Sequence, residues 1–88
     1  MGAVAERLQC IFDLAEEKTY DSIEDVVDQA IDQFADRKVE VKVLRKLGTL
    51  LYNMNEFDLE GELREVLIEV AAVGGGIKLA VAAEMRNE

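Results

Sequence analysis

The spacing of apolar residues along the chain predicts a protein built from helices. Apolar positions recur at steps of three and four, which is the spacing of one face of a helix. The pattern covers residues 3–18, 21–36, 37–54 and 59–86. It is most regular in the last segment, at Leu59, Leu63, Val66, Val70, Val73, Ile77 and Val81. We therefore predict an all-α fold, a small bundle of four to five helices.

The second segment is the clearest amphipathic helix in the sequence. It begins where Asp21 or Ser22 is placed to cap a helix. Its apolar side consists of Ile23, Val26, Val27, Ala30, Ile31 and Phe34. At about 100° per residue, the opposite side is an aspartate stripe formed by Asp25, Asp28, Asp32 and Asp36. This arrangement predicts one face in the core and one acidic face in water.

The third segment allows two interpretations. Val39, Val41 and Val43 alternate with Glu40 and Lys42, which is typical of a strand. A helix over residues 37–54 instead places apolar residues on one face through several turns and gathers basic residues on the other. We favour the helix, because a lone strand would have no partner in this sequence. Its end is marked by asparagines, and the next helix is expected to begin around Asn55 and Asp58.

Three consecutive glycines, residues 74–76, interrupt the last segment. Each glycine in a helix interior costs about 1 kcal/mol relative to alanine, which favours a break into helices 59–73 and 77–86. The apolar face stays in register across the glycines, however, which favours a continuous helix with a close backbone approach. A phosphate-binding loop is disfavoured because the GxxxxGK[ST] spacing is absent. The break is the preferred interpretation.

Length and composition indicate one small intracellular domain, residues 1–88. Half of the residues are hydrophobic and none is proline, which suits helices. The single Cys10 has no partner for an internal disulfide, so we expect a cytoplasmic protein with Cys10 as a small core residue. A chain this short buries a modest core, so we also expect a homo-oligomer, a dimer through the C-terminal helical stretch. The core is predicted to include Val26, Ile31, Phe34, Leu47, Leu51, Leu63, Val66, Leu67 and Val70.

Charge is distributed unevenly along the chain, whose net charge is −9. Residues 19–36 contain six acidic and no basic residues, and residues 51–73 contain six acidic and one basic residue. Residues 37–50 between them contain five basic residues and one acidic residue. One interpretation is intramolecular, with the basic helix lying near its acidic neighbours and forming weak surface pairs.

Composition argues against catalysis, metal binding and a membrane location. The chain has no histidine, so it lacks the commonest general base and the commonest zinc ligand. The aspartates of residues 21–36 do not follow the calcium-binding loop pattern of an EF-hand. No apolar stretch is long enough to cross a bilayer, and anionic lipids would repel most of the surface. We expect no enzyme activity, no cofactor and no metal.

Direct nucleic-acid binding is also disfavoured. The basic residues between Arg37 and Lys46 could contact phosphates, but the net charge of −9 repels a polyanion. Residues 20–31 faintly resemble the helix that follows the strand in ribbon-helix-helix antitoxins. The preceding alternating strand is missing and aspartates replace the usual basic positions, so the resemblance implies nothing about function.

Two functions remain, and both involve a protein partner. The first is a protein-interaction module whose apolar C-terminal stretch pairs with another copy or a partner helix. The second is an acidic inhibitor or DNA mimic that blocks the basic groove of a nucleic-acid-binding protein, because carboxylates along a helix lie about 5–6 Å apart, like phosphates along a strand. The candidate partner-binding residues are Asp21, Asp25, Asp28, Asp32 and Asp36, with Glu56, Glu60, Glu62, Glu65 and Glu69 as a second set.

Overall fold

The computed structural model of the chain describes residues 4–18, 21–73 and 76–86, and these residues form helices and short connections. The side chains of Asp21, Ser22, Val73, Met85 and Arg86 are outside this description. The helices are α1 (Val4–Glu16), α2 (Asp21–Ala35), α3 (Val41–Asn53), α4 (Phe57–Val73) and α5 (Ile77–Arg86). The predicted all-α fold is therefore confirmed.

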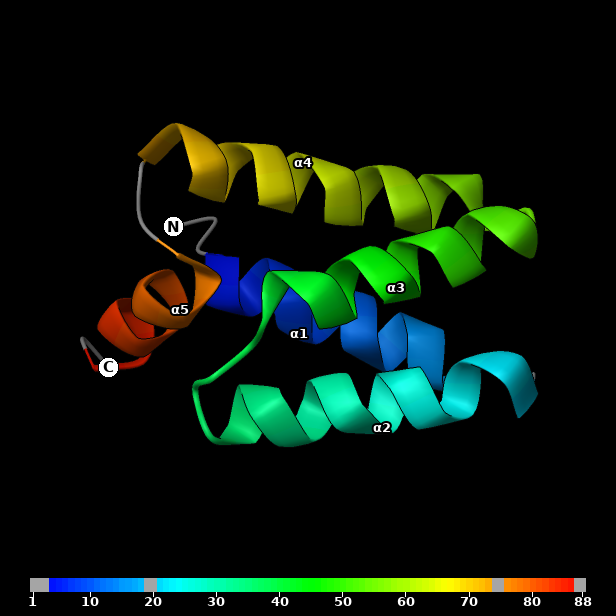
Figure 1. Cartoon of the computed structure of the whole chain (residues 1–88), viewed down its shortest axis with the longest axis horizontal. Helices are drawn as coiled ribbons and strands as arrows, with labels where there is room; N and C mark the ends of the chain where they lie inside the picture. Colours follow the sequence, from blue (N-terminus) through cyan, green and yellow to red (C-terminus); the bar gives the residue numbers. More distant parts are fainter. Residues whose placement is uncertain (1–3, 19–20, 74–75, 87–88) are drawn as a thin grey trace.

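Helices α1 to α4 run back and forth as an antiparallel bundle (Figure 1). Both α1 and α3 pack against α2 and against α4. As a result, α2 and α4 lie at opposite corners of the bundle. The short helix α5 packs mainly on α1 and lies at the end of the bundle where α1 begins and α4 ends (Figure 1).

The core is made almost entirely of aliphatic side chains from all five helices. Among the described side chains, no polar or charged residue is buried. One aromatic pair contributes, with the ring of Phe12 edge-on to that of Phe34 at a centroid distance of 5.6 Å. The fully enclosed side chains include Leu8, Ile11, Phe12, Ile23, Val27, Val39, Leu44, Leu47, Leu51, Leu63, Val66 and Ile77.

The predicted core is confirmed for most of its members and corrected for three. Ile31, Phe34 and Leu67 pack against the core but are only partly buried. Ile31 and Leu67 lie at the flanks of the apolar faces of their helices, at about 100° per residue, and Phe34 lies in the last turn of α2. The prediction for Cys10 is wrong, since this residue is exposed. It follows the buried Leu8 by two positions, which turns it to the far side of α1.

The connection between α2 and α3 corrects the predicted start of the third helix. Residues 37–40 are not helical, and α3 begins at Val41. Arg37 has a left-handed backbone, with φ of 59°. The amide of Lys38 donates to the carbonyl of Gln33 at 2.8 Å, and that of Arg37 donates to Phe34 at 3.0 Å. These two bonds form a Schellman motif, which ends α2 and turns the chain.

Gln33 holds the start of α3 against the end of α2. The backbone amide of Glu40 donates to the side-chain oxygen of Gln33 at 2.9 Å. Glu40 is extended, with φ of −93° and ψ of 140°, and the preceding Val39 is fully buried. The alternating valines at 39, 41 and 43 therefore reflect a buried anchor followed by a helix start, rather than a strand.

The connection between α3 and α4 contains a second Schellman motif. Asn55 has φ of 63°. Its amide donates to Tyr52 at 3.0 Å, and the amide of Glu56 donates to Leu51 at 2.9 Å. Asn55 thus ends α3, as its position suggested, but it does not begin the next helix, which starts at Phe57. Asp58 lies in the first turn of α4.

Helices α4 and α5 are separate and make a sharp angle. The segments Phe57–Ala72 and Ile77–Glu84 are bent by 92° relative to each other. This agrees with the preferred break, although Gly74 and Gly75 themselves lie outside the described residues. Within the described part of the chain, no single helix combines the length and apolar character that a membrane span needs; α4 and α5 meet that test only when taken together as this bent pair.

A carboxylate fixes α5 to the beginning of α1. The two oxygens of Glu84 accept hydrogen bonds from the backbone amides of Val4, at 3.0 Å, and Ala5, at 2.7 Å. The first amides of a helix have no partner within the helix, and a negative charge is favourable at this end. A residue 80 positions away therefore caps the first helix of the protein.

Candidate functional surfaces

The aspartate stripe of α2 faces solvent. Asp25, Asp28 and Asp32 are exposed on the helix, and Asp36 is exposed in the turn that follows it. Asp21 is the first residue of α2, but its side chain is outside the described set. Among the described side chains, none of the other four forms an ion pair; the ion pairs of the molecule lie elsewhere. The stripe is thus a negative surface without ion pairs to the described part of the chain.

The second acidic set, near and on α4, is mostly used inside the molecule. Arg7 of α1 pairs with Glu69 and lies 3.6 Å from a carboxylate oxygen of Glu65. Glu60 binds the guanidinium of Arg64 through two contacts, of 3.2 Å and 2.5 Å.

Glu56 and Glu62 complete this set. Glu56 pairs with Lys18 at 3.2 Å, which ties the end of α1 to the α3–α4 connection. Glu62 is exposed and has no ion pair within the described residues.

The basic residues of α3 do not neutralise the aspartate stripe. Lys42, Arg45 and Lys46 are exposed. In the described part of the chain their one ion pair joins Lys42 to Glu40, at 3.5 Å, just before the helix. The expected surface pairs between the basic helix and α2 are therefore not found, because α2 turns its apolar side, and not its aspartates, toward α3.

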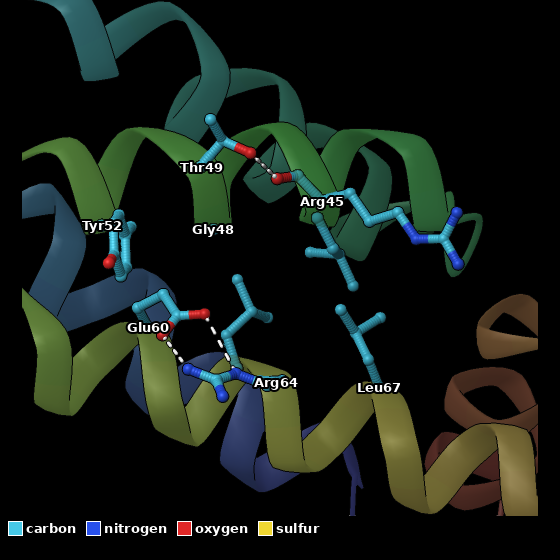
Figure 2. Close-up of a pocket in the computed structure, with 9 residues that line it drawn as sticks. Arg45, Gly48, Thr49, Tyr52, Glu60, Arg64 and Leu67 are labelled. Atoms are coloured by element: carbon cyan, nitrogen blue, oxygen red, sulfur yellow. Dashed lines mark hydrogen bonds and ion pairs between the residues drawn. The ribbon is translucent and has the colours of Figure 1, made fainter.

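A groove runs between α3 and α4 (Figure 2). Its volume is about 480 Å³. Leu44 and Leu63 form a buried floor, and Leu67 points into the space from α4. The residues that line the groove are Leu44, Arg45, Gly48, Thr49, Tyr52, Glu60, Leu63, Arg64 and Leu67.

Gly48 keeps this groove open. It sits in the middle of α3 and presents no side chain to the groove (Figure 2). A β-carbon added there would stand 3.7 Å from the Cδ2 atom of Leu63, an ordinary contact distance. A larger side chain at this position would therefore project over the floor of the groove without disturbing the backbone.

The ends and edges of the groove combine aromatic and charged groups. Tyr52 is 57% exposed and Phe57 is 52% exposed, and their rings meet edge-on at 5.2 Å. Arg45 and Arg64 stand on opposite sides of the groove. The hydrogen bond and the negative charge of Glu60 raise the pKa of Arg64 above its ordinary value, so this side chain is always a cation.

The arrangement consists of an apolar groove with charged edges on one side of the bundle and an acidic helix face on another. Within the described residues, no three carboxylate or thiol side chains are placed to hold a metal ion. Sequence reasoning located the aspartate stripe, but it missed the groove and the role of Glu84. A glycine within a predicted amphipathic helix, Gly48, was the available signal for the groove. Glu84 gave no local signal, because its contacts are with the other end of the chain.

Comparison with known proteins adds no relative to this description. No protein-family model, no curated protein and no solved structure matches the chain.

Proposed function

We propose that this chain is a protein-interaction module that binds another protein through the groove between α3 and α4. The observation that supports the proposal is an open groove with an apolar floor, beside which lie two exposed aromatic rings. Helical segments commonly bind such grooves by inserting apolar side chains. Exposed aromatic residues at the edge are typical of the positions that dominate binding energy.

The charges beside the groove indicate the partner's chemistry. Arg45 lies at the groove, and Lys42 and Lys46 lie on the same helix. Arg64 on the other side is already paired with Glu60. The partner is therefore an amphipathic helix with apolar anchors for Leu63 and Leu67 and an acidic group that meets Arg45.

A second function is favoured by a different observation, the unpaired aspartate stripe. The exposed carboxylates of Asp25, Asp28 and Asp32, which form no ion pair within the described residues, would attract a basic protein surface. On this reading the chain acts as an inhibitor or DNA mimic that occupies the basic groove of a nucleic-acid-binding protein. The two functions need partners of opposite charge at the contact.

A tagged pull-down from the source cell, with partners identified by mass spectrometry, tests both functions. Three variants accompany the wild type: Gly48→Leu, which fills the groove; Gly61→Leu, the same change on the outer side of α4; and Asp25→Asn/Asp28→Asn/Asp32→Asn. A β-carbon at Gly61 meets no atom within 4 Å, so Gly61→Leu is a matched control for the added side chain. Circular dichroism and a thermal melt confirm that each variant folds.

The groove function predicts a partner that is lost with Gly48→Leu and kept by both other variants at moderate salt. Binding of the purified partner, titrated by calorimetry, should then weaken at least about tenfold with Gly48→Leu. A partner that survives Gly48→Leu, but is lost with the triple asparagine variant and with salt, would overturn the groove function in favour of the acidic inhibitor.

A further inference from the structure

The outer side of α4 has an apolar composition that is unusual for a solvent-facing surface. The inner row of α4, Leu59, Leu63, Val66 and Val70, is buried. Opposite this row, at about 100° per residue, lie Phe57, Gly61, Arg64, Ile68 and Ala72. We call these five residues the outer row. Ile68 is 63% exposed and Phe57 is 52% exposed, and nothing stands within 4 Å of a β-carbon added at Gly61.

The outer row, together with Glu65 beside it, is complementary to itself when reversed. Consider a second α4 that lies antiparallel to the first, so that the pair is centred between residues 64 and 65. Residue 57 then faces residue 72, residue 61 faces 68, and residue 64 faces 65. Each pair then joins opposites: Phe57 meets the small Ala72, Ile68 meets the bare Gly61, and Arg64 meets Glu65 of the other copy. Each pair occurs twice, as a two-fold interface requires.

A parallel arrangement in the same register lacks this complementarity. It would place Arg64 against Arg64, Phe57 against Phe57 and Gly61 against Gly61. Like charges would oppose each other, large side chains would collide and small ones would leave a gap. The size and charge pattern therefore favours the antiparallel arrangement over this parallel one.

The distribution of charge over the rest of the molecule supports the same partner. Each chain has a net charge of −9, so a second copy is repelled by most of the surface. The unpaired aspartate stripe lies on α2, at the corner of the bundle opposite α4 (Figure 1). Contact through the outer row keeps the two stripes as far apart as the bundle allows.

Glu65 is available to the second copy. It is an exposed side chain, 74% accessible, and its contact with Arg7 of its own chain is long, at 3.6 Å. Arg64 is 62% accessible and extends from the outer row while bound to Glu60. In the antiparallel pair, Arg64 lies between Glu60 of its own chain and Glu65 of the other.

From these observations we propose that the outer row of α4 binds a second copy of this chain, antiparallel and centred between residues 64 and 65, to form a two-fold dimer. This surface is separate from the floor of the proposed groove, and two residues of the outer row, Arg64 and Phe57, lie beside the groove as well. The proposed dimer can therefore be tested independently of the proposed groove function.

Sedimentation equilibrium of the purified chain over a range of concentrations tests the dimer. We expect a mass near twice 9.8 kDa for the wild type. Gly61→Leu should raise the dimer dissociation constant at least about tenfold, because the added side chain collides with Ile68 of the other copy. Gly48→Leu should leave the constant unchanged, since Gly48 lies in the groove.

A charge-exchange series tests the orientation. Arg64→Glu and Glu65→Arg should each weaken the dimer at least about tenfold, because each places like charges together across the interface. The double variant Arg64→Glu/Glu65→Arg should restore it, since the pair of opposite charges is then re-formed in reverse. Within one helix, adjacent residues do not face each other, so a purely intramolecular effect cannot produce this rescue.

Disulfide trapping tests the register, in a Cys10→Ser background that removes the native thiol. Chains with Gly61→Cys mixed with chains with Ile68→Cys should cross-link to each other. Neither chain should cross-link to itself, because residues 61 and 68 are separated by about 10 Å along a helix. A monomeric mass at every concentration, no rescue by the double variant, or cross-linking of Gly61→Cys to itself would each overturn the proposal.

Discussion

Helices α2 and α4 occupy opposite corners of the same bundle, and both carry several carboxylates, yet the molecule uses them differently. Glu60, Glu65 and Glu69 of α4 bind arginines of α1 and α4. The described aspartates of the α2 stripe form no ion pair within the described part of the chain. Their outer faces differ as well, since that of α2 is acidic and that of α4 is largely apolar.

The difference shows that a count of charges does not identify a binding surface. On the α4 side, two carboxylates are neutralised within the molecule because Arg7 of α1 pairs with Glu65 and Glu69. On the α2 side, the neighbouring basic helix α3 turns its cations away from the stripe. The aspartates of the stripe therefore form no ion pair within the described residues, while α4 exposes apolar side chains on its outer row and at the groove.

The largest change in the free energy of unfolding is expected at Glu84, whose carboxylate joins the two ends of the chain. Glu84→Gln should lower the free energy of unfolding by about 1–3 kcal/mol, because the charged cap of the Val4 and Ala5 amides is lost. Urea denaturation measures the change, and hydrogen exchange of those two amides should accelerate. Glu62→Gln, an exposed carboxylate without a partner in the described residues, is the matched control and should have little effect.

A backbone change at the end of α2 should have the next largest effect. Arg37→Gly should raise the free energy of unfolding by about 0.5–1 kcal/mol, since glycine adopts a left-handed backbone without the steric cost that arginine has. Thermal denaturation at low and high salt measures it. The gain should be independent of salt. If Arg37 instead neutralises the aspartate stripe, Arg37→Gly would destabilise the protein at low salt, and so would Arg37→Gln.

Removal of the glutamates that bind Arg7 should produce a smaller loss. Glu65→Gln/Glu69→Gln is expected to lower the free energy of unfolding by about 0.5–1 kcal/mol, as is typical of partly exposed ion pairs. Urea denaturation at low salt measures the loss, which should shrink at high salt. A variant as stable as the wild type would show that these pairs do not distinguish α4 from α2.

The same chemical change on α2 should have the smallest effect and the opposite sign. Asp28→Asn/Asp32→Asn should raise the free energy of unfolding by a few tenths of a kcal/mol at low salt, because two carboxylates four residues apart repel each other. Asp32 also lies in the last turn of α2, where a negative charge is unfavourable. The gain should vanish at high salt. A clear loss of stability would reveal a cation that the stripe binds.

The apolar periodicity determined most of the fold. It located the helices to within a few residues, because burial on one side of a helix requires apolar residues at steps of three and four. The strong cost of consecutive glycines likewise indicated the division between α4 and α5. The sequence pattern failed at residues 37–40, where the left-handed Arg37 ends α2 and the buried Val39 follows. Arginine gives no local sign that it will adopt this backbone.

Of the proposed binding surfaces, too, the sequence predicted one part and only the structure showed the rest. The aspartate stripe was visible in the sequence, because exposed positions on an amphipathic helix follow from its period. The groove, the caps and the partners of each charge depend on which helices become neighbours. Arg7 is 58 and 62 residues from the glutamates that it binds, and Glu84 is about 80 residues from the amides that it caps. Only the packing of the helices brings such residues together, so the tertiary structure alone decided which acidic groups form contacts within the molecule and which face solvent without an ion pair in the described chain.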